Sequence, residues 1–543
     1  PDAEPRMYLG GVLGGSLGRS LPGAFVAYCE NTGRVSYSGA FIVSHIGGIV
    51  GYNMRVKTKF CINRGEIVSA ARGVEEGSDR YCQEMAGGIC GMAESGNIDF
   101  CETTLDAAHT IRTEGGEISM TGGIAGSMNG GRISACTFTG TGVLEAAFNT
   151  VPEGYYVYAQ AGGIVGSTAE ASIESCTADF GGSLLVPKGG EATCNAGIVC
   201  GNSGSSITDC TAKFTGDASI ESNGTISFGG AVGSLSGVGE CAVSLVSTEM
   251  GGTVKIAQGD EYSDVHVGGV FGSASNATAS ACDALLSGDI EISSNVADGT
   301  TNVNVGGVCG KSGMLTAGCH AEWTESAHVK IASDRSNFGG VTGLTQAESN
   351  YAFLVGCYAL CNGRVEIEPK NGTDYTANAG GIAGTFSGYS MIYPVVMDGC
   401  YALVETDFSL SGGTARGVAG ASEAALLNGV FWGSTQDGVS ETLPDSKAFA
   451  SLDQSGFEAA IAEMNDAIAA SMMAQLVQVG YTYDTGTSRP DRRPLTGASP
   501  TSIYKFTPAG KSDRGEPFSE TIGRFPFKSH ARPEKRNIPR ISA

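Results

Sequence analysis

The sequence predicts an all-β protein, a parallel β-solenoid in which about twelve coils of three short strands stack on one another. Three observations lead to this prediction: a glycine motif that recurs at a nearly constant interval, a cysteine that follows most copies at a similar distance, and period-two alternation of apolar and polar residues. A repeat of this kind cannot bury its own apolar face and is stable only when stacked on its neighbours. We expect right-handed coils, because parallel crossovers are nearly always right-handed.

The recurring motif is Gly-Gly-apolar-x-Gly, with small departures in two copies. Its last glycine falls at Gly14, Gly51, Gly91, Gly126, Gly166, Gly201, Gly233, Gly272, Gly310, Gly343, Gly384 and Gly420. Successive copies are 32 to 41 residues apart. We expect these glycines at corners of the coil, which need a left-handed φ or a close approach of two backbones. The length differences, at 69–84, 145–160 and 369–378, should be loops that leave a constant core.

A cysteine lies 8 to 10 residues after the motif in eight of the first eleven repeats. The surrounding sequence, as in SIESCTADF at 172–180, alternates in polarity and predicts a short strand with one buried face, and a further run such as RVEIE at 364–368 predicts the third strand. Equivalent cysteines in successive coils should form a structural ladder of buried free thiols, because parallel Cβ vectors disfavour disulfides. The predicted ladder comprises Cys61, Cys101, Cys136, Cys176, Cys210, Cys241, Cys282 and Cys319.

The remaining cysteines allow some disulfides but give no sign of a zinc site. Cys82 with Cys90, and Cys194 with Cys200, are the best disulfide candidates. The total of 17 is odd, so at least one thiol lacks an intramolecular partner. No Cys-x-x-Cys pair occurs, and we therefore expect no structural zinc.

Composition excludes several classes of protein. Glycine accounts for 83 of 543 residues, roughly twice the average usage of about 7 %, but without the three-residue period of collagen. Acidic residues outnumber basic ones 56 to 33, giving a net charge of −23, which argues against a nucleic-acid partner. No apolar run is long enough to predict a membrane span.

The chain divides into three regions. Residues 1–435 hold the repeats, residues 436–488 should form a cap of one helix and one strand, and residues 489–543 form a basic, proline-rich tail that we expect to be disordered. Ser455 and Glu458 form a capping box, followed by apolar residues at helical spacing. The first motif begins at Gly10 and leaves no room for a polar cap, so we expect an upstream piece that includes a signal or anchor.

The segments GGIAGSMNGGRISACTFTG at 122–140 and AGGIVGSTAEASIESCTADFGG at 161–182 resemble the GLUG-motif repeats of bacterial surface proteins. Those repeats join a Gly-Gly-apolar-x-Gly start to a downstream Gly-x-Ile-x-x-Cys-Tyr/Thr segment, and they occur in adhesin-like proteins and beside protease domains of secreted bacterial enzymes. The resemblance covers about residues 10–435. It implies a bacterial protein that is secreted or displayed at the cell surface, but it assigns no activity.

Few side chains have the pattern of a ligand site. Asp260, Glu261 and Asp264 form an acidic loop that is a weak Ca²⁺ candidate, and a solvated loop is the favoured interpretation because no EF-hand or Gly-Gly-x-Gly-x-Asp pattern occurs. Tyr155, Tyr156 and Tyr158 form a possible sugar-stacking platform or the start of an apolar strand. No catalytic constellation and no other cofactor site emerges, since the histidines do not recur at the repeat period.

The sequence favours a rigid rod that displays variable loops and acts in adhesion or ligand binding. Its expected partner is a glycan or protein on a host or neighbouring cell, and we expect a monomer. Two alternatives remain open: a β-helix carbohydrate-active enzyme, either a polysaccharide lyase or a hydrolase, and a structural spacer for a catalytic module. The enzyme would require Asp, Glu and Arg from three neighbouring coils to converge in one groove.

Overall fold

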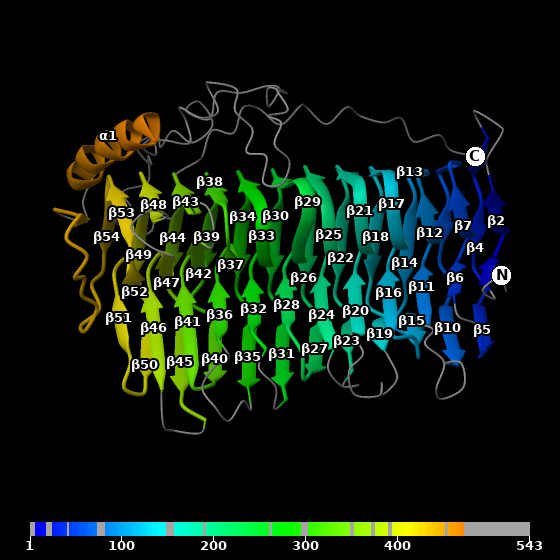
Figure 1. Ribbon diagram of the computed structural model, residues 1–543, viewed down its shortest axis with the longest axis horizontal. Helices are drawn as coiled ribbons and strands as arrows, with labels where there is room; N and C mark the ends of the chain where they lie inside the picture. Colours follow the sequence, from blue (N-terminus) through cyan, green and yellow to red (C-terminus); the bar gives the residue numbers. More distant parts are fainter. Residues whose placement is uncertain are drawn as a thin grey trace, which may run out of the picture.

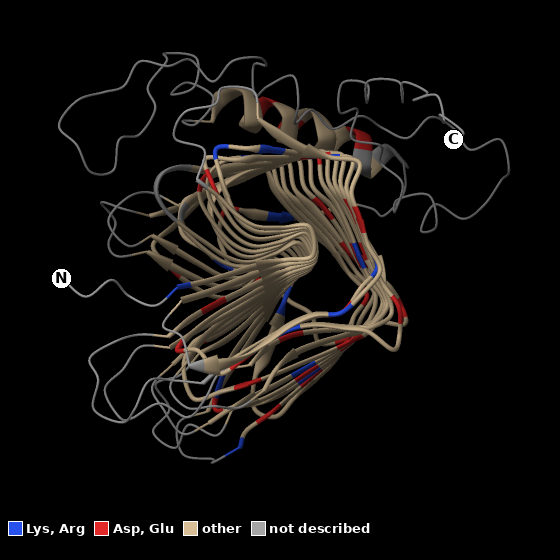
Figure 2. Ribbon diagram, turned by 90° about the vertical axis from the view of Figure 1, so that its right-hand side faces the viewer, with Lys and Arg blue, Asp and Glu red and all other residues tan. Residues whose placement is uncertain are grey.

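A computed structural model shows a β-solenoid of stacked coils, built almost entirely from parallel strands (Figure 1). The structure describes residues 6–17, 24–40, 43–72, 82–147, 157–187, 192–259, 263–294, 302–347, 352–370, 375–388, 394–450 and 454–471. Viewed from the N-terminal end, the coils superimpose, so the cross-section stays nearly constant along the axis (Figure 2). The predicted fold class is therefore confirmed.

Each coil contributes to four parallel sheets, which we name A to D in chain order. In one coil these strands are β11 (Gln83–Gly87) in sheet A, β12 (Cys90–Glu94) with β13 (Asn97–Asp99) in sheet B, β14 (Glu102–Leu105) in sheet C and β15 (Thr110–Glu114) in sheet D. Sheet A has 12 strands, from β1 (Arg6–Gly10) to β51 (Thr414–Arg416), one for each copy of the motif. Sheet C has 13 strands and sheet D has 11.

The predicted strand across each cysteine is in fact two strands that meet at a corner. SIESCTADF is split between the end of β21 (Val165–Glu174) and β22 (Thr177–Phe180), because Ser175 has a left-handed φ of 52°. This break gives the coil its fourth strand. The third predicted strand is present as β45 (Arg364–Glu368) in sheet D.

The motif glycines form the corner between sheets A and B. Gly87 and Gly122 lie in register on neighbouring coils. A Cβ added at Gly126 would lie 2.7 Å from both the backbone nitrogen of Ala86 and the carbonyl oxygen of Gly91. These glycines are therefore required by close backbone approach, and the left-handed residues lie elsewhere.

Inward side chains form columns that continue from coil to coil. Ile98, Ile133 and Ile173 are in register and fully buried in sheet B. In sheet C, the rings of Phe138 and Phe180 pack with centroids 5.3 Å apart. Because each column repeats at the strand spacing, neighbouring coils bury one another's apolar faces, as the sequence pattern predicts.

The last coil is covered by residues that follow the repeats. The Glu441 carboxylate accepts hydrogen bonds from the backbone amides of Val418 (2.7 Å) and Ala419 (3.2 Å), which belong to the final motif copy. Strand β55 (Ser446–Ala448) extends sheet C. These contacts occupy an edge that would otherwise offer unpaired backbone groups.

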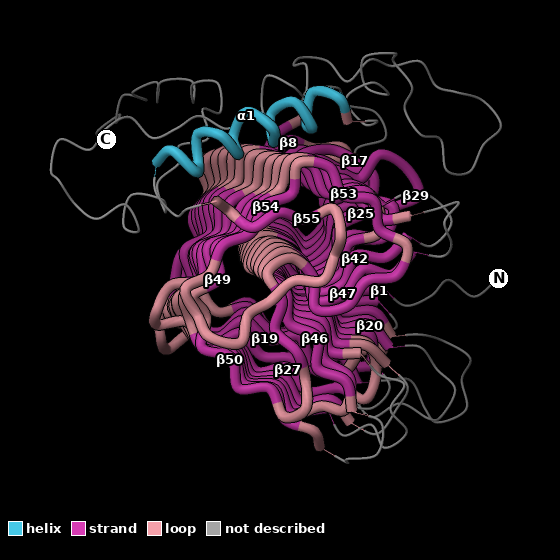
Figure 3. The backbone as a smooth tube through the Cα atoms, turned by 90° about the vertical axis from the view of Figure 1, so that its left-hand side faces the viewer, coloured by secondary structure: helices cyan, strands magenta, loops and turns pink. Residues whose placement is uncertain are grey.

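The predicted helix is α1 (Gln454–Ala470), which lies beside the final coils (Figure 3). Its Ile461, Met464 and Ile468 are buried, as their helical spacing predicts. Met464 and Ile468 lie directly against Gly399. Across the described part of the chain, no helix is long and apolar enough to span a membrane. The sequence YTYD at 481–484, which supplies the strand predicted for the cap, and the tail at 489–543 lie outside the described residues.

Candidate functional site

The corner between sheets B and C is formed by a left-handed residue in every coil. We name this column of residues the B–C corner. It comprises Tyr28, Phe60, Phe100, Ala135, Ser175, Asp209, Leu245, Ala281, Gly318, Gly356, Gly399 and Gly429, with φ between 50° and 60°. Because an outward-pointing side chain at this turn does not belong to the core, the corner can vary without disturbing the stack.

The residue after each corner position points inward, and in most coils it is a cysteine. The thiol of Cys136 donates to the carbonyl oxygen of Ser134 at 3.4 Å and lies 3.5 Å from that of Ile98 in the preceding coil. The backbone amide of Cys101 in turn donates to the Cys136 sulfur at 3.4 Å. The thiols therefore satisfy backbone groups at the turn. Burial raises the pKa of the Cys136 thiol well above its ordinary value and keeps it protonated.

Seven of the eight proposed ladder cysteines occupy this column. The exception is Cys241, which is in register with Ala277 inside sheet B, whereas Val246 holds the ladder position of its coil. Cys29, Cys357 and Cys400 also follow corner residues and extend the ladder. All 17 cysteines are free thiols, so the two proposed disulfides, Cys82–Cys90 and Cys194–Cys200, are absent.

In the first three coils the B–C corner carries three exposed aromatic side chains. Tyr28, Phe60 and Phe100 form a continuous stack, with 5.2 Å between successive ring centroids and 11° between ring planes. Parallel rings in contact lie about 3.5–4 Å apart plane to plane, so this centroid distance means that successive rings are offset and do not cover each other completely. Even Phe60, the central ring, is 43 % exposed.

These aromatic residues occupy an unfavourable backbone conformation. A left-handed φ costs a residue with a Cβ roughly 1–2 kcal/mol, and glycine avoids this cost. The same corner is glycine in the last four coils, at Gly318, Gly356, Gly399 and Gly429. The fold therefore accepts glycine here, and the aromatic rings are neither required by the turn nor buried in the core. Exposed apolar surface of this kind is typical of a binding site.

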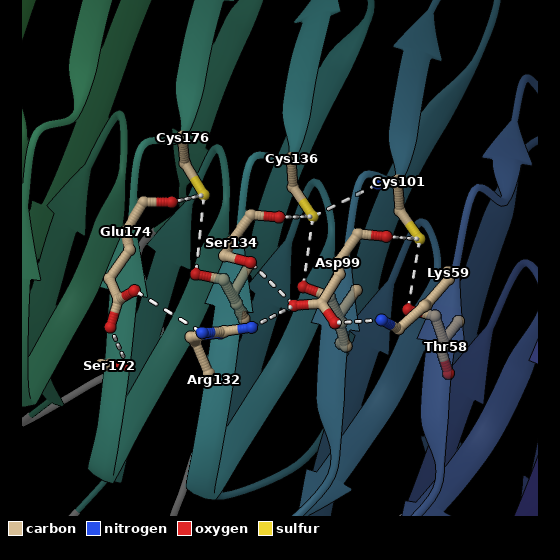
Figure 4. Close-up of polar contacts among 12 residues, drawn as sticks. Thr58, Lys59, Asp99, Cys101, Arg132, Ser134, Cys136, Ser172, Glu174 and Cys176 are labelled. Carbon is tan, nitrogen blue, oxygen red and sulfur yellow. Dashed lines mark hydrogen bonds and ion pairs between the residues drawn. The ribbon is translucent and has the colours of Figure 1, made fainter. Parts of the chain in front are cut away.

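On the sheet B side, the residue before Phe100 is a buried carboxylate, Asp99, and Figure 4 shows Lys59 and Arg132 on either side of it. Asp99 accepts a hydrogen bond from Ser134 (2.7 Å) and pairs with Lys59 and Arg132, each at 3.2 Å. Burial alone would raise the pKa of Asp99, but the hydrogen bonds from Ser134, Lys59 and Arg132 outweigh it and lower the pKa. Asp99 is thus a fixed anion that positions Lys59 and Arg132. The nearby Lys57 side chain is exposed.

The sheet C side of the stack is acidic. Glu30 and Glu102 directly follow the ladder cysteines of the first and third coils, and both are about half exposed. Arg64 lies between them, 3.1 Å from the Glu30 carboxylate and 3.8 Å from that of Glu102. The aromatic stack is therefore flanked by hydrogen-bond donors on one side and by acceptors, joined through Arg64, on the other.

Only Asp264 and Tyr158 among the ligand candidates singled out from sequence lie in the described part of the chain. Asp264 accepts from the backbone amide of Asn302 at 2.9 Å, and Asp260 and Glu261 lie outside the described residues. Within the described ranges, no group of three or more His, Cys, Asp or Glu side chains is arranged to hold a metal ion. Tyr158 is partly exposed on β20 (Val157–Gly162) in sheet A, and Tyr155 and Tyr156 lie outside the described residues.

One charged group does draw residues from three neighbouring coils together, as the enzyme alternative requires. Arg132 lies 3.2 Å from Asp99 and 3.9 Å from Glu174. The Asp99 side chain is only 2 % exposed and is ionised by its partners. A carboxylate held in this way is a poor general acid, because its proton is lost well below neutral pH.

The aromatic stack was not identified from sequence, although a signal was present. Tyr28, Phe60 and Phe100 each directly precede a cysteine in three successive repeats. An aromatic residue is common in strands, so at this place in a predicted continuous strand it attracts no notice. Only the left-handed turn in the structure shows that its side chain points outward.

Comparison of the chain with protein-family models, with curated proteins and with solved structures found no match.

Proposed function

We propose that this protein is a ligand-binding rod that acts in adhesion, and that the aromatic stack at the B–C corner is its contact surface. The observation that carries the proposal is the exposure of Tyr28, Phe60 and Phe100 at positions where the fold accepts glycine. A contiguous stack of three exposed rings at strained backbone positions, unlike a single exposed apolar residue, is best explained by a role outside folding. The partner is a glycan or a protein on the surface of a host or neighbouring cell.

The repeat architecture supports a surface location. A solenoid is a rigid scaffold that presents a surface at fixed spacing, and the resemblance of the repeats to GLUG-motif repeats agrees with a secreted or cell-surface bacterial protein. The buried thiol ladder is compatible with export because the sulfur atoms are shielded from oxidants by the coil interior. The chain acts as a monomer in this proposal.

A glycan and host-matrix array, with and without Ca²⁺, tests the proposal. The variants are Phe60→Gly and Phe100→Gly, and the matched control is Leu245→Gly, because Leu245 occupies the same corner with a φ of 55° and is 49 % exposed. We expect binding by the parent chain and the control, and weaker binding by both aromatic variants. Equal binding by all four proteins would contradict the assignment of the site.

The same array distinguishes the alternatives. Release of soluble fragments from an immobilised glycan would identify an enzyme and direct attention to carboxylates elsewhere on the solenoid. Absence of both binding and turnover would favour a structural spacer.

A further inference from the structure

We infer that the ligand of the aromatic stack is an extended, neutral polysaccharide that lies parallel to the solenoid axis, with one sugar ring on each coil. This inference rests on the proposed function and specifies its ligand. It follows from three features of the corner: the spacing of the rings, the chemistry of the two flanks and the contrast with the corner that α1 covers.

The ring spacing matches a linear sugar polymer. The centroids of Tyr28, Phe60 and Phe100 are separated by 5.2 Å, one coil each, along the solenoid axis. An extended chain of pyranose rings advances by one sugar over nearly the same distance. Each ring leaves part of its surface exposed, and the apolar C–H groups of a pyranose ring pack on an aromatic surface of this kind. Three coils therefore offer three successive sugar subsites.

The flanks offer the hydrogen bonds that a polyhydroxylated ligand needs. Lys57 and Lys59, both in the second coil, provide donors on the sheet B side, and Glu30 and Glu102, in the first and third coils, provide acceptors on the sheet C side. Sugar hydroxyls both donate and accept, so they are satisfied on both sides. Arg64 pairs with both carboxylates and Asp99 pairs with Lys59, so the charges around the first three coils nearly balance. A polyanionic glycan or an anionic lipid surface would therefore find little net attraction here, whereas a neutral ligand needs none.

In the last coils the B–C corner is covered by α1, and its residues differ from those in the first three coils. There, Gly399 and Gly429 allow the backbone of α1 to approach closely, with the Met464 carbonyl oxygen 2.5 Å from a Cβ placed at Gly399. Aromatic rings at Phe60 and Phe100 would hold a helix away from the corner. The first three coils are therefore built for a ligand that rests on rings, and the last coils for a helix.

Calorimetric titration with cello- and chito-oligosaccharides of one to six sugars tests the inference, with oligogalacturonates as the anionic comparison. We expect affinity to rise roughly two- to tenfold for each added sugar up to three or four, and then to level off. In Phe60→Gly and Phe100→Gly the affinity should stop rising at a shorter oligosaccharide, whereas Leu245→Gly should show the same length dependence as the parent chain.

The outcomes separate this inference from the proposed function. If the aromatic variants weaken array binding but no neutral series shows a length dependence, the binding site stands and the polysaccharide inference is wrong. Preference for oligogalacturonates, or binding of a matrix protein alone, would also overturn it. If the aromatic variants change nothing in either experiment, both proposals fail.

Discussion

Replacing Phe100 by glycine should be less destabilising than replacing it by alanine, the reverse of the usual order in strands. Both changes remove the ring, with the loss of a stacking contact worth about 0.5–1.5 kcal/mol and of partial burial worth about 1 kcal/mol. Glycine also relieves a left-handed φ of 56°, which costs roughly 1–2 kcal/mol. It increases the unfolded-chain entropy at a cost of about 0.5–1 kcal/mol.

The net expectation is that Phe100→Gly is more stable than Phe100→Ala by about 0.5–1 kcal/mol. Urea unfolding followed by circular dichroism measures the difference in midpoint, with equal slopes as the condition for comparing the two variants. Leu285, exposed on β34 (Asp283–Leu286), is the control position. There Leu285→Ala should be more stable than Leu285→Gly, which is the usual order in a strand. If Phe100→Gly were less stable than Phe100→Ala, strain at the corner would not exist and the argument from it would be lost.

Three further predictions concern other parts of the solenoid. Gly399→Ala should detach α1, because the added Cβ meets Ile468, and limited proteolysis should then cleave the helix faster. Gly412→Ala is the control: its φ is 76° and no neighbour lies nearer than 3.9 Å, so it should cause strain without detaching α1. Burial lowers the pKa of His266 to about 4, below its unfolded value of about 6.5, so the unfolded chain binds more protons between these values. Stability should therefore fall as pH drops through that range, by up to roughly 1.4 kcal/mol per pH unit, and urea midpoints of His266→Asn should fall less steeply. The ladder thiols should resist a water-soluble thiol reagent at pH 8 in the native protein and react fully in urea, and rapid native labelling of more than the partly exposed Cys29 would contradict their burial.

The fold could be predicted because the repeat fixes it at every copy. Gly87 and Gly122 stand in register for the same reason that the motif recurs: a side chain at either position would collide with the neighbouring backbone. The corner at the cysteine could not be predicted, because its left-handed residue has no constant identity and ranges from Tyr28 to Gly429. Counting from the motif also misplaced Cys241, since its coil has a longer sheet B strand and Val246 holds the equivalent position.

Because the corner residue can vary in type without changing the coil, a binding site is expected at a corner rather than on a sheet face. A side chain on a sheet face is constrained by its register neighbours, as in the pairing of Lys255 with Glu291 on the next coil. At the B–C corner the backbone turn is held by contacts such as those of the Cys136 thiol, so the outward residue can differ in type from coil to coil. Aromatic rings at one end and glycines at the other can then serve a ligand and a helix without any change in the coil. A variant that combines Phe60→Gly and Phe100→Gly with Gly318→Phe and Gly356→Phe should therefore fold. Its affinity for oligosaccharides measures whether α1 leaves the two new rings accessible.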